Sequence, residues 1–80
     1  MDIVDIESKL NAIFRDFFSD NSLTIREDMT ANDVSGWDSI SHINLILTVE
    51  KAFGIRFTTR EVRSMKNVGD FIGIIHQKTG

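Results

Sequence analysis

The stretch Gly36-Trp37-Asp38-Ser39-Ile40-Ser41-His42-Ile43-Asn44-Leu45-Ile46-Leu47-Thr48-Val49-Glu50-Lys51-Ala52-Phe53-Gly54 decides the fold of this chain. An aspartate, which is a favoured N-cap residue, precedes a long aliphatic run. The glycine at position 54 suits the left-handed residue that commonly follows the last turn of a helix. The sequence therefore predicts an α-helix over about residues 39–53, with Ser39 exposed at its N-terminus, beside the positive end of the helix dipole.

The side chains of this helix divide into two faces when they are placed at 100° per residue. The narrow polar stripe consists of Ser41, Asn44, Thr48 and Lys51, and Ile40 and Leu47 fall at its border. The broad apolar side consists of Ile43, Leu45, Ile46, Val49, Ala52 and Phe53, interrupted by His42 and Glu50. We expect the apolar side, including Phe53, to pack on the core and the polar stripe to face away from it.

Three further helices are predicted from spacing and capping signals. Over residues 3–17, apolar side chains recur at steps of three and four, with Asp2 as the expected N-cap. Thr58 and Glu61 form a capping-box pattern that opens a short helix to about Lys66. Asn67 is the expected cap of a last helix, in which Val68, Phe71, Ile72 and Ile75 share one face. Nothing in the sequence predicts a paired strand, so we expect an all-α four-helix bundle.

A long polar loop over residues 19–38 separates the first two helices. A loop of this length is unusual in a compact domain. It contains Leu23, Ile25, Met29, Val34 and Trp37, which can pin it to the core. Trp37 is expected either to cover the core or to contact a partner beside Ser39.

Composition limits the possible functions. Eighty residues predict a single domain spanning residues 1–80, and the absence of cysteine excludes disulfides and thiolate metal sites. No apolar run is long enough to span a bilayer, and the acidic N-terminus has the wrong sign for a secretory signal. We therefore expect a cytoplasmic protein. The net charge of −3 argues against a nucleic-acid partner.

The decisive stretch resembles the modification site of acyl carrier proteins, where Gly-x-Asp-Ser-Leu opens the second helix. Here Gly36-Trp37-Asp38-Ser39 is followed by Ile40 in place of the usual leucine. The similarity continues through Glu50 and Phe53-Gly54-Ile55, and Val68 and Asp70 fit the start of the family's last helix. The helix order, the long first loop and the chain length also agree with this family.

The resemblance implies a carrier and not an enzyme. Ser39 would carry a 4′-phosphopantetheine arm derived from coenzyme A, and Asp38 would cap the helix and contact the phosphopantetheinyl transferase. The free N–H groups of the first helical turn are expected to stabilise the attached phosphoryl group. Other partners would be an acyl- or aminoacyl-loading enzyme and a downstream synthase or transferase, and we expect a monomer. An alkyl cargo would be sheathed by the aliphatic core residues Ile43, Ile46, Leu47, Phe53, Ile72 and Ile75.

The charge distribution departs from that of the fatty-acid carriers in this family. Those carriers have acidic residues along the exposed face of the second helix, where this chain has Ser41, Asn44 and Lys51. Residues 51–80 carry a net charge of +4, against −7 for residues 1–50. We therefore expect a dedicated carrier with its own partners. Its docking surface is predicted to consist of Trp37, Ser41, Asn44, Leu47, Thr48, Lys51, Arg60 and Arg63.

Three alternative functions are also considered from the sequence. Asp38, Ser39 and His42 could suggest a hydrolytic set, but the aspartate is better placed as a helix cap and so small a chain has little room for a cleft. His42 is expected to be packed or interfacial, and His76 to be solvated near the C-terminus. The remaining alternatives are an unmodified carrier-like interaction domain and a small helix-turn-helix regulator, which the acidic composition disfavours.

Overall fold

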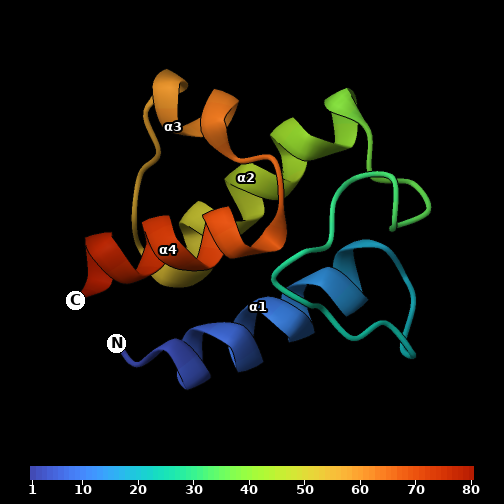
Figure 1. Cartoon of the computed structure of the whole chain (residues 1–80), viewed down its shortest axis with the longest axis horizontal. Helices are drawn as coiled ribbons and strands as arrows, with labels where there is room; N and C mark the ends of the chain where they lie inside the picture. The colour runs from blue at the N-terminus through green and yellow to red at the C-terminus, as the bar shows by residue number, and fades with distance from the viewer.

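The computed structural model describes all residues from Met1 to Gly80 and contains four α-helices and no strand (Figure 1). The helices are α1 (Ile3–Phe17), α2 (Ser39–Phe53), α3 (Thr59–Ser64) and α4 (Val68–Thr79). The predicted all-α architecture and the order of the helices are confirmed. The third helix ends at Ser64 rather than Lys66, because Met65 has an extended backbone conformation.

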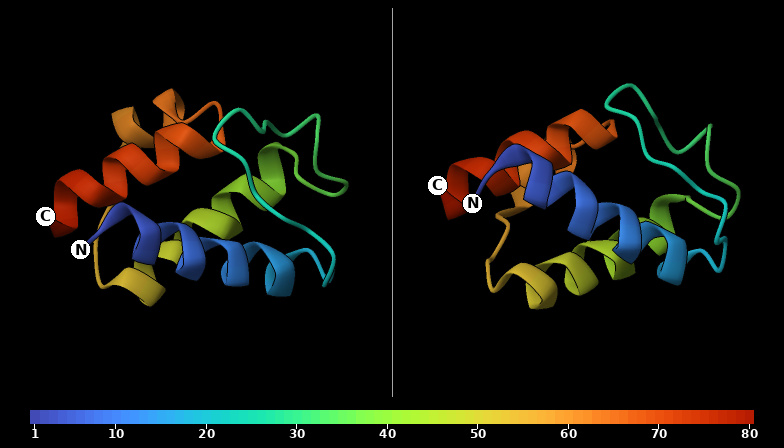
Figure 2. Two further views of the ribbon diagram at one scale, coloured as in Figure 1. Left: turned by 60° about the horizontal axis from the view of Figure 1, so that its bottom comes forward. Right: turned by 90° about the horizontal axis from the view of Figure 1, so that it is seen from below.

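The three longer helices pack together, and the short α3 joins α2 to α4 (Figure 2). Helix α1 contacts both α2 and α4. The two chain ends lie side by side, where the N-terminal ammonium group donates a hydrogen bond to the carbonyl of Thr79 at 3.1 Å. No helix has both the length and the apolar character needed to cross a membrane.

The core contains only apolar side chains. Fourteen residues are buried, and none of them is polar or charged. Phe14 on α1 and Phe71 on α4 are completely buried and meet edge to face, with ring centroids 6.1 Å apart. The Trp37 ring packs edge-on to Phe14 at 5.3 Å, so the end of the long loop contributes to the core. Phe53 is half-buried and packs against this cluster, as predicted.

Side-chain caps fix the starts of three helices. The capping boxes pair Asp38 with Ser41, Thr58 with Glu61, and Asn67 with Asp70, which confirms the three predicted caps. Asp2 occupies the N-cap position of α1, but its side chain accepts no capping hydrogen bond. Gly54 ends α2 with φ +66°, the left-handed conformation that the sequence predicted.

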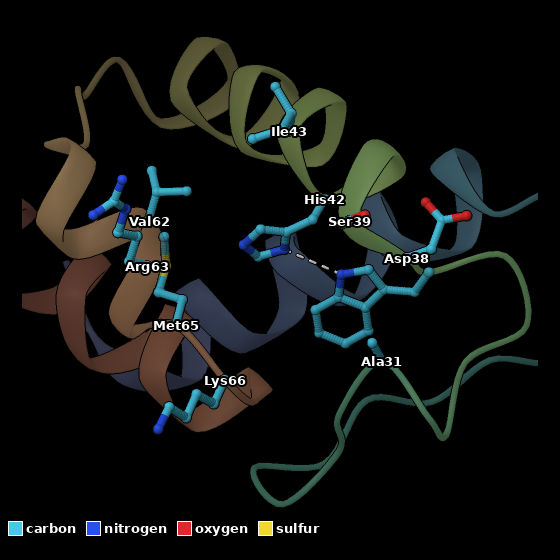
Figure 3. A pocket seen from close by; sticks show the side chains of 10 residues that line it. Ala31, Asp38, Ser39, His42, Ile43, Val62, Arg63, Met65 and Lys66 are labelled. Atoms are coloured by element: carbon cyan, nitrogen blue, oxygen red, sulfur yellow. Dashed lines mark hydrogen bonds between the residues drawn. The ribbon is translucent and has the colours of Figure 1, made fainter.

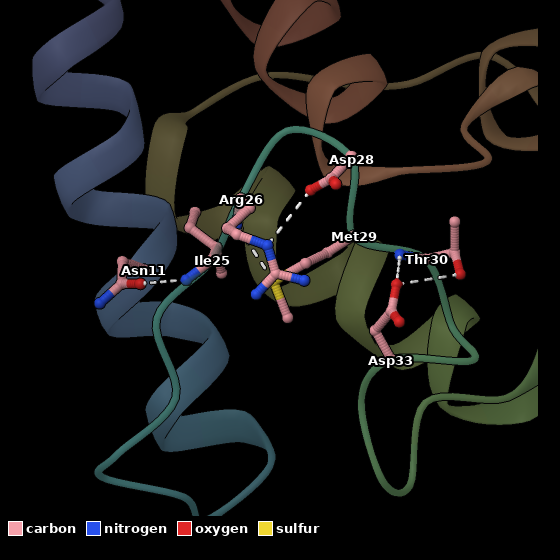
Figure 4. Close-up of polar contacts among 7 residues, drawn as sticks. All are labelled: Asn11, Ile25, Arg26, Asp28, Met29, Thr30 and Asp33. Carbon is pink, nitrogen blue, oxygen red and sulfur yellow. Dashed lines mark hydrogen bonds and ion pairs between the residues drawn. The ribbon is translucent and has the colours of Figure 1, made fainter.

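The long loop is pinned to the helices by buried side chains and by backbone hydrogen bonds. Met29 and Val34 are buried together with Trp37. The N–H of Val68 donates to the carbonyl of Met29, and the N–H of Gly69 donates to the carbonyl of Glu27, both at 2.9 Å. On the α1 side, Oδ1 of Asn11 accepts a hydrogen bond from the N–H of Ile25 at 2.8 Å (Figure 4).

Short-range polar contacts shape the same loop close to these anchor points. Arg26 forms an ion pair with Asp28 at 3.3 Å, and the Asp33 carboxylate accepts a hydrogen bond from the N–H of Thr30 at 3.0 Å (Figure 4). These contacts fix the path of the loop, and so they fix the positions of Gly36, Trp37 and Asp38 before the start of α2.

The apolar side of α2 is wider than the surface that its neighbours cover. Leu45, Ile46 and Val49 are buried, but Ile43 is 53 % exposed. The expectation that Ile43 packs into the core is therefore wrong, because no helix packs over that part of the α2 surface. Ile40 and Leu47, which the sequence placed at the border, are 76 % and 51 % exposed.

Candidate functional site

Ser39 is the first residue of α2, and its side chain is exposed. Its hydroxyl forms no hydrogen bond within the chain, so it is free to react without breaking a structural contact. Ser39 does not cap the helix, because Asp38 does. The prediction that Asp38, and not Ser39, caps α2 is confirmed.

The cap beside Ser39 is a closed network. Oδ1 of Asp38 accepts hydrogen bonds from the N–H groups of Ile40 at 3.0 Å and Ser41 at 2.9 Å. In return, the Ser41 hydroxyl accepts a hydrogen bond from the N–H of Asp38 at 2.8 Å. It also lies 2.7 Å from the carbonyl of Gly36, to which it donates. The N–H of Ser41, followed by that of Ile40, holds the pKa of the Asp38 carboxyl below its ordinary value.

This network reduces the number of free first-turn N–H groups that could hold a phosphoryl group. The N–H groups of Ile40 and Ser41 are already bonded to the Asp38 carboxylate. A group attached to Ser39 would therefore lie beside a carboxylate that stays charged. The N–H of Ser39 forms no such bond, so stabilisation of a phosphoryl group depends on this one donor, the helix dipole and solvent.

A groove of about 380 Å³ opens beside Ser39, between the start of α2 and helix α3 (Figure 3). Its apolar lining comes mainly from Trp37, Ile43, Val62 and Met65. Asp38 and Ser39 lie on one side of it, and Arg63 and Lys66 lie across from them on the segment that contains α3. The groove therefore has a carboxylate at one side and two cations at the other.

Trp37 and His42 form the wall between this groove and the core. The indole Nε1–H donates a hydrogen bond to Nδ1 of His42 at 3.1 Å, and the two rings stack with an angle of 22° between their planes. Trp37 is only 5 % exposed, so it covers the core; a direct role in partner binding stays a prediction.

The hydrolytic alternative does not fit this geometry. A neutral His42 that accepts on Nδ1 carries its proton on Nε2, so neither nitrogen is placed to deprotonate Ser39 and be oriented by Asp38. The Asp38 carboxylate is engaged with the backbone instead. His76 is exposed as expected, but it is more than a solvated end residue, because its Nδ1 contacts the carbonyl of Met1 at 3.0 Å.

The other residues predicted for the docking surface lie on α2 and α3. Asn44, Leu47, Thr48, Lys51, Arg60 and Arg63 are exposed. Ser41 is only half-exposed and its hydroxyl is engaged in the cap. A neighbouring feature was not predicted from the sequence: Ile40 and Ile43 join Leu47 in an exposed apolar stripe that begins next to Ser39. The position of Ile40 and Leu47 at the border of the polar stripe could have indicated that these side chains are exposed.

The six residues expected to sheath an alkyl chain separate into two groups. Ile46, Ile72 and Ile75 are buried and do not line either hollow of the surface, and Phe53 is half-buried. Ile43 lines the groove beside Ser39, and Leu47 lines a second hollow near the end of α2. Glu50, which also lines that second hollow, accepts a hydrogen bond from the N–H of Phe57 at 2.8 Å and so fixes the turn after α2.

Helical packing around an exposed serine at the start of α2 defines a small carrier-type domain, and comparison with known proteins agrees. No family model matches the chain. It is 25 % identical over 76 residues to an acyl carrier protein of Thermotoga maritima, covering 95 % of this chain and 94 % of that protein. It is also 40 % identical over 38 residues to an acyl carrier protein of Arthrobacter, and this match covers 48 % of this chain and 47 % of that protein.

A solved structure is similar to this chain in both sequence and fold. The solution structure of the holo acyl carrier protein from Geobacter metallireducens matches with a TM-score of 0.85 and 39 % identity, over 90 % of this chain and 83 % of that one. The chain belongs to the acyl carrier protein family. It is therefore a carrier and not an enzyme.

Proposed function

We propose that Ser39 carries a 4′-phosphopantetheine arm and that the chain delivers an acyl or aminoacyl cargo to the enzymes of one pathway. The observation that supports this most directly is the exposed, unbonded hydroxyl of Ser39 at the start of α2, next to an open groove. The surroundings fit the group, because the hydroxyl projects into solvent and the groove offers room beside it. When bound, the arm supplies a thiol that holds the cargo as a thioester.

The chain contributes position rather than activation to the attachment. Asp38 accepts hydrogen bonds from the backbone through Oδ1, and the N–H of Ser41 lowers the pKa of its carboxyl, which makes it a weak base. The transferase must therefore remove the Ser39 proton, while Oγ forms a bond to phosphorus and the bond from phosphorus to the adenosine bisphosphate leaving group breaks. Asp38 keeps Ser39 at the first helical position and offers its outer carboxylate oxygen to the transferase.

We assign partner docking to the exposed surface that surrounds Ser39. The apolar stripe of Ile40, Ile43 and Leu47 lies beside the polar residues Asn44, Thr48 and Lys51. Arg60 and Arg63 extend this surface onto α3. This combination favours partners with an apolar contact and acidic groups opposite the arginines. The fatty-acid pattern of acidic residues is missing, which favours a dedicated pathway.

Intact mass spectrometry after incubation with coenzyme A and a broad-specificity phosphopantetheinyl transferase tests the attachment. We expect one added arm on the wild type and none on Ser39→Ala. Ser35→Ala, which replaces an exposed serine of the long loop, is the control and should also gain one arm. Circular dichroism should show that Ser39→Ala is folded, because its side chain makes no structural bond. Modification of Ser39→Ala, or a wild type that several transferases leave unmodified, would contradict the proposal and favour an unmodified interaction domain.

A further inference from the structure

The hydrogen bond between Trp37 and His42 depends on the charge of the imidazole. Nε1–H of the indole donates to Nδ1 of His42 at 3.1 Å, so Nδ1 carries a lone pair and the ring is neutral (Figure 3). A protonated imidazole has an N–H at both ring nitrogens and cannot accept this bond. Imidazole is the side chain that ordinarily changes charge between about pH 5 and 8. The bond is therefore sensitive to pH in that range.

The indole N–H of Trp37 has no second acceptor. Its bond to His42 is the only hydrogen bond that this group makes, and the side chain is 5 % exposed. The indole ring lies against the aromatic rings of Phe14, Phe18 and Phe71. An unpaired donor in such apolar surroundings is unfavourable. Protonation of His42 therefore favours an indole that leaves this position and turns its N–H toward solvent.

Charged groups on α2 and on the segment that contains α3 act on the imidazole in opposite directions. His42 shares the lining of the groove with Asp38, Arg63 and Lys66. The Asp38 carboxylate attracts a positive charge on the imidazole, whereas the two cations oppose it. The N-terminal end of the α2 dipole also opposes it. These charges affect how readily the ring gains a proton, and the geometry of the bond decides what the proton does.

The long loop and α4 contact His42 through uncharged rings. The loop contributes the indole of Trp37, and α4 contributes Phe71, whose ring centroid lies 5.8 Å from that of the imidazole. The carboxylate at the start of α4, Asp70, accepts a hydrogen bond from the backbone N–H of Lys66 at 2.9 Å. The titration of the imidazole therefore acts on these two elements mainly through its bond to the indole.

Trp37 lies in the short segment that leads into Ser39. On one side of it, the Ser41 hydroxyl donates to the carbonyl of Gly36 at 2.7 Å. On the other side, the N–H of Asp38 donates to the same hydroxyl at 2.8 Å. These bonds hold the two ends of the segment, and the indole anchors its middle. Of these contacts, only the one that anchors the indole involves an imidazole.

We propose that neutral His42 is a positioning residue for the modification of Ser39, and that protonation of its imidazole releases Trp37 and slows this modification. The inference rests on the proposed arm at Ser39. An enzyme that binds the start of α2 meets a fixed segment while the indole is held, and must order that segment when the indole is released. The Ser39 hydroxyl and the activation by the transferase do not change. The effect therefore falls on KM rather than on kcat.

Nuclear magnetic resonance of the unmodified wild-type protein tests the bond itself. At about pH 8 we expect the ring ¹⁵N shifts of a neutral His42 protonated on Nε2, and a ¹⁵N–¹⁵N coupling between its Nδ1 and Nε1 of Trp37. At about pH 5 the ring should be charged, the coupling should be lost, and the indole N–H should exchange faster with solvent. A coupling that persists on a charged ring, or a ring that stays neutral at about pH 5, would overturn the inference.

His42→Asn separates the charge of residue 42 from its role as an acceptor. Its amide oxygen can accept from the indole N–H, but the amide does not titrate. Initial rates of arm transfer from coenzyme A by a broad-specificity transferase are measured by intact mass, and the wild type is divided by His42→Asn at each pH. This ratio removes the pH dependence of the transferase. We expect a kcat/KM ratio near one at about pH 7.5, and lower by about two- to tenfold at about pH 5.5, through a higher KM.

His76→Asn is the matched control. His76 is the only other histidine, and it is exposed on α4, where its Nδ1 contacts the carbonyl of Met1. This variant should follow the wild type at both pH values. A ratio of wild type to His42→Asn that is the same at both pH values, or a decrease that His76→Asn abolishes, would show that His42 does not position Ser39. A wild type that stays unmodified at both pH values would contradict the proposed arm instead.

Discussion

The indole N–H of Trp37 donates a hydrogen bond to Nδ1 of His42 at 3.1 Å, and this bond joins the end of the long loop to the first turn of α2. The Trp37 ring is buried, so its N–H has no water to replace the histidine. The pair therefore couples the position of the loop that precedes Ser39 to the helix that begins with it.

Replacing His42 with alanine should leave the Trp37 N–H without an acceptor. We expect the free energy of unfolding to fall by about 1–3 kcal/mol, measured by urea denaturation followed by far-ultraviolet circular dichroism, which needs no tryptophan. In a Trp37→Phe background, which has no N–H to satisfy, the same His42→Ala change should cost less. Equal costs in the two backgrounds would show that His42 contributes through packing alone.

Two glycines of α4 provide a matched pair of substitutions. A Cβ at Gly69 would lie 3.1 Å from the carbonyl oxygen of Glu27 and 3.2 Å from Oδ1 of Asn67, whereas a Cβ at Gly73 meets nothing within 4 Å. Gly69→Ala should lower stability by about 1–3 kcal/mol, because it pushes the long loop away from the start of α4. Gly73→Ala should raise stability by up to about 1 kcal/mol through helix propensity. Thermal unfolding of both variants measures this, and a stabilised Gly69→Ala would contradict the described loop contact.

Acid should destabilise the fold through its helix caps. The N–H of Ser41 lowers the pKa of Asp38, and the N–H of Thr58, followed by Lys78, lowers that of Glu61. A carboxyl whose pKa is lower in the folded state stabilises it above the unfolded pKa, and this contribution is lost as the pH falls through the folded value. Urea midpoints should therefore decrease from about pH 6 to about pH 3, and the decrease should be smaller in Asp38→Asn. An unchanged pH dependence in Asp38→Asn would show that this cap does not contribute to it.

Local signals predicted most of the fold correctly. Asp38, Thr58 and Asn67 each cap a helix through contacts within three residues, so the sequence alone contains the whole interaction. Gly54 likewise marks the end of α2 by its own backbone conformation. Such features depend only on residues that are neighbours in the sequence, so they can be predicted without knowledge of the tertiary structure.

The features that the sequence did not predict depend on contacts between distant segments. Helical periodicity placed Ile43 on the apolar side of α2, but whether that side is covered depends on where α3 lies. The bond between Trp37 and His42 requires the path of the loop, and the placement of Arg63 across a groove from Ser39 requires the turn between α2 and α3. The exposed Ser39 was predictable because its position follows from the Asp38 cap alone.

The contrast between Phe71 and Phe53 tests the description of the core. Phe71 is completely buried, so Phe71→Ala should cost about 3–5 kcal/mol, which approaches the whole stability of a small domain. Phe53 is half-buried, and the Lys9 ammonium lies 4.8 Å from its ring centroid. Phe53→Ala should therefore cost less than Phe71→Ala. Chemical denaturation of the two variants gives the order, and a Phe53→Ala curve that overlays the wild type would show that the end of α2 does not pack as described.

The basic residues of α3 should control the choice of partner. Arg60 and Arg63 are exposed and are not neutralised by ion pairs within the chain, so an enzyme with acidic groups opposite them associates faster. Arg60→Glu with Arg63→Glu should slow loading by the cognate enzyme at low salt, and raised salt should reduce the difference from wild type. Arg26→Glu, a charge reversal on the long loop, should have a much smaller effect on the loading rate. If the double reversal loads as fast as wild type at low salt, the arginines form only a solvated surface and docking depends on the apolar stripe of α2.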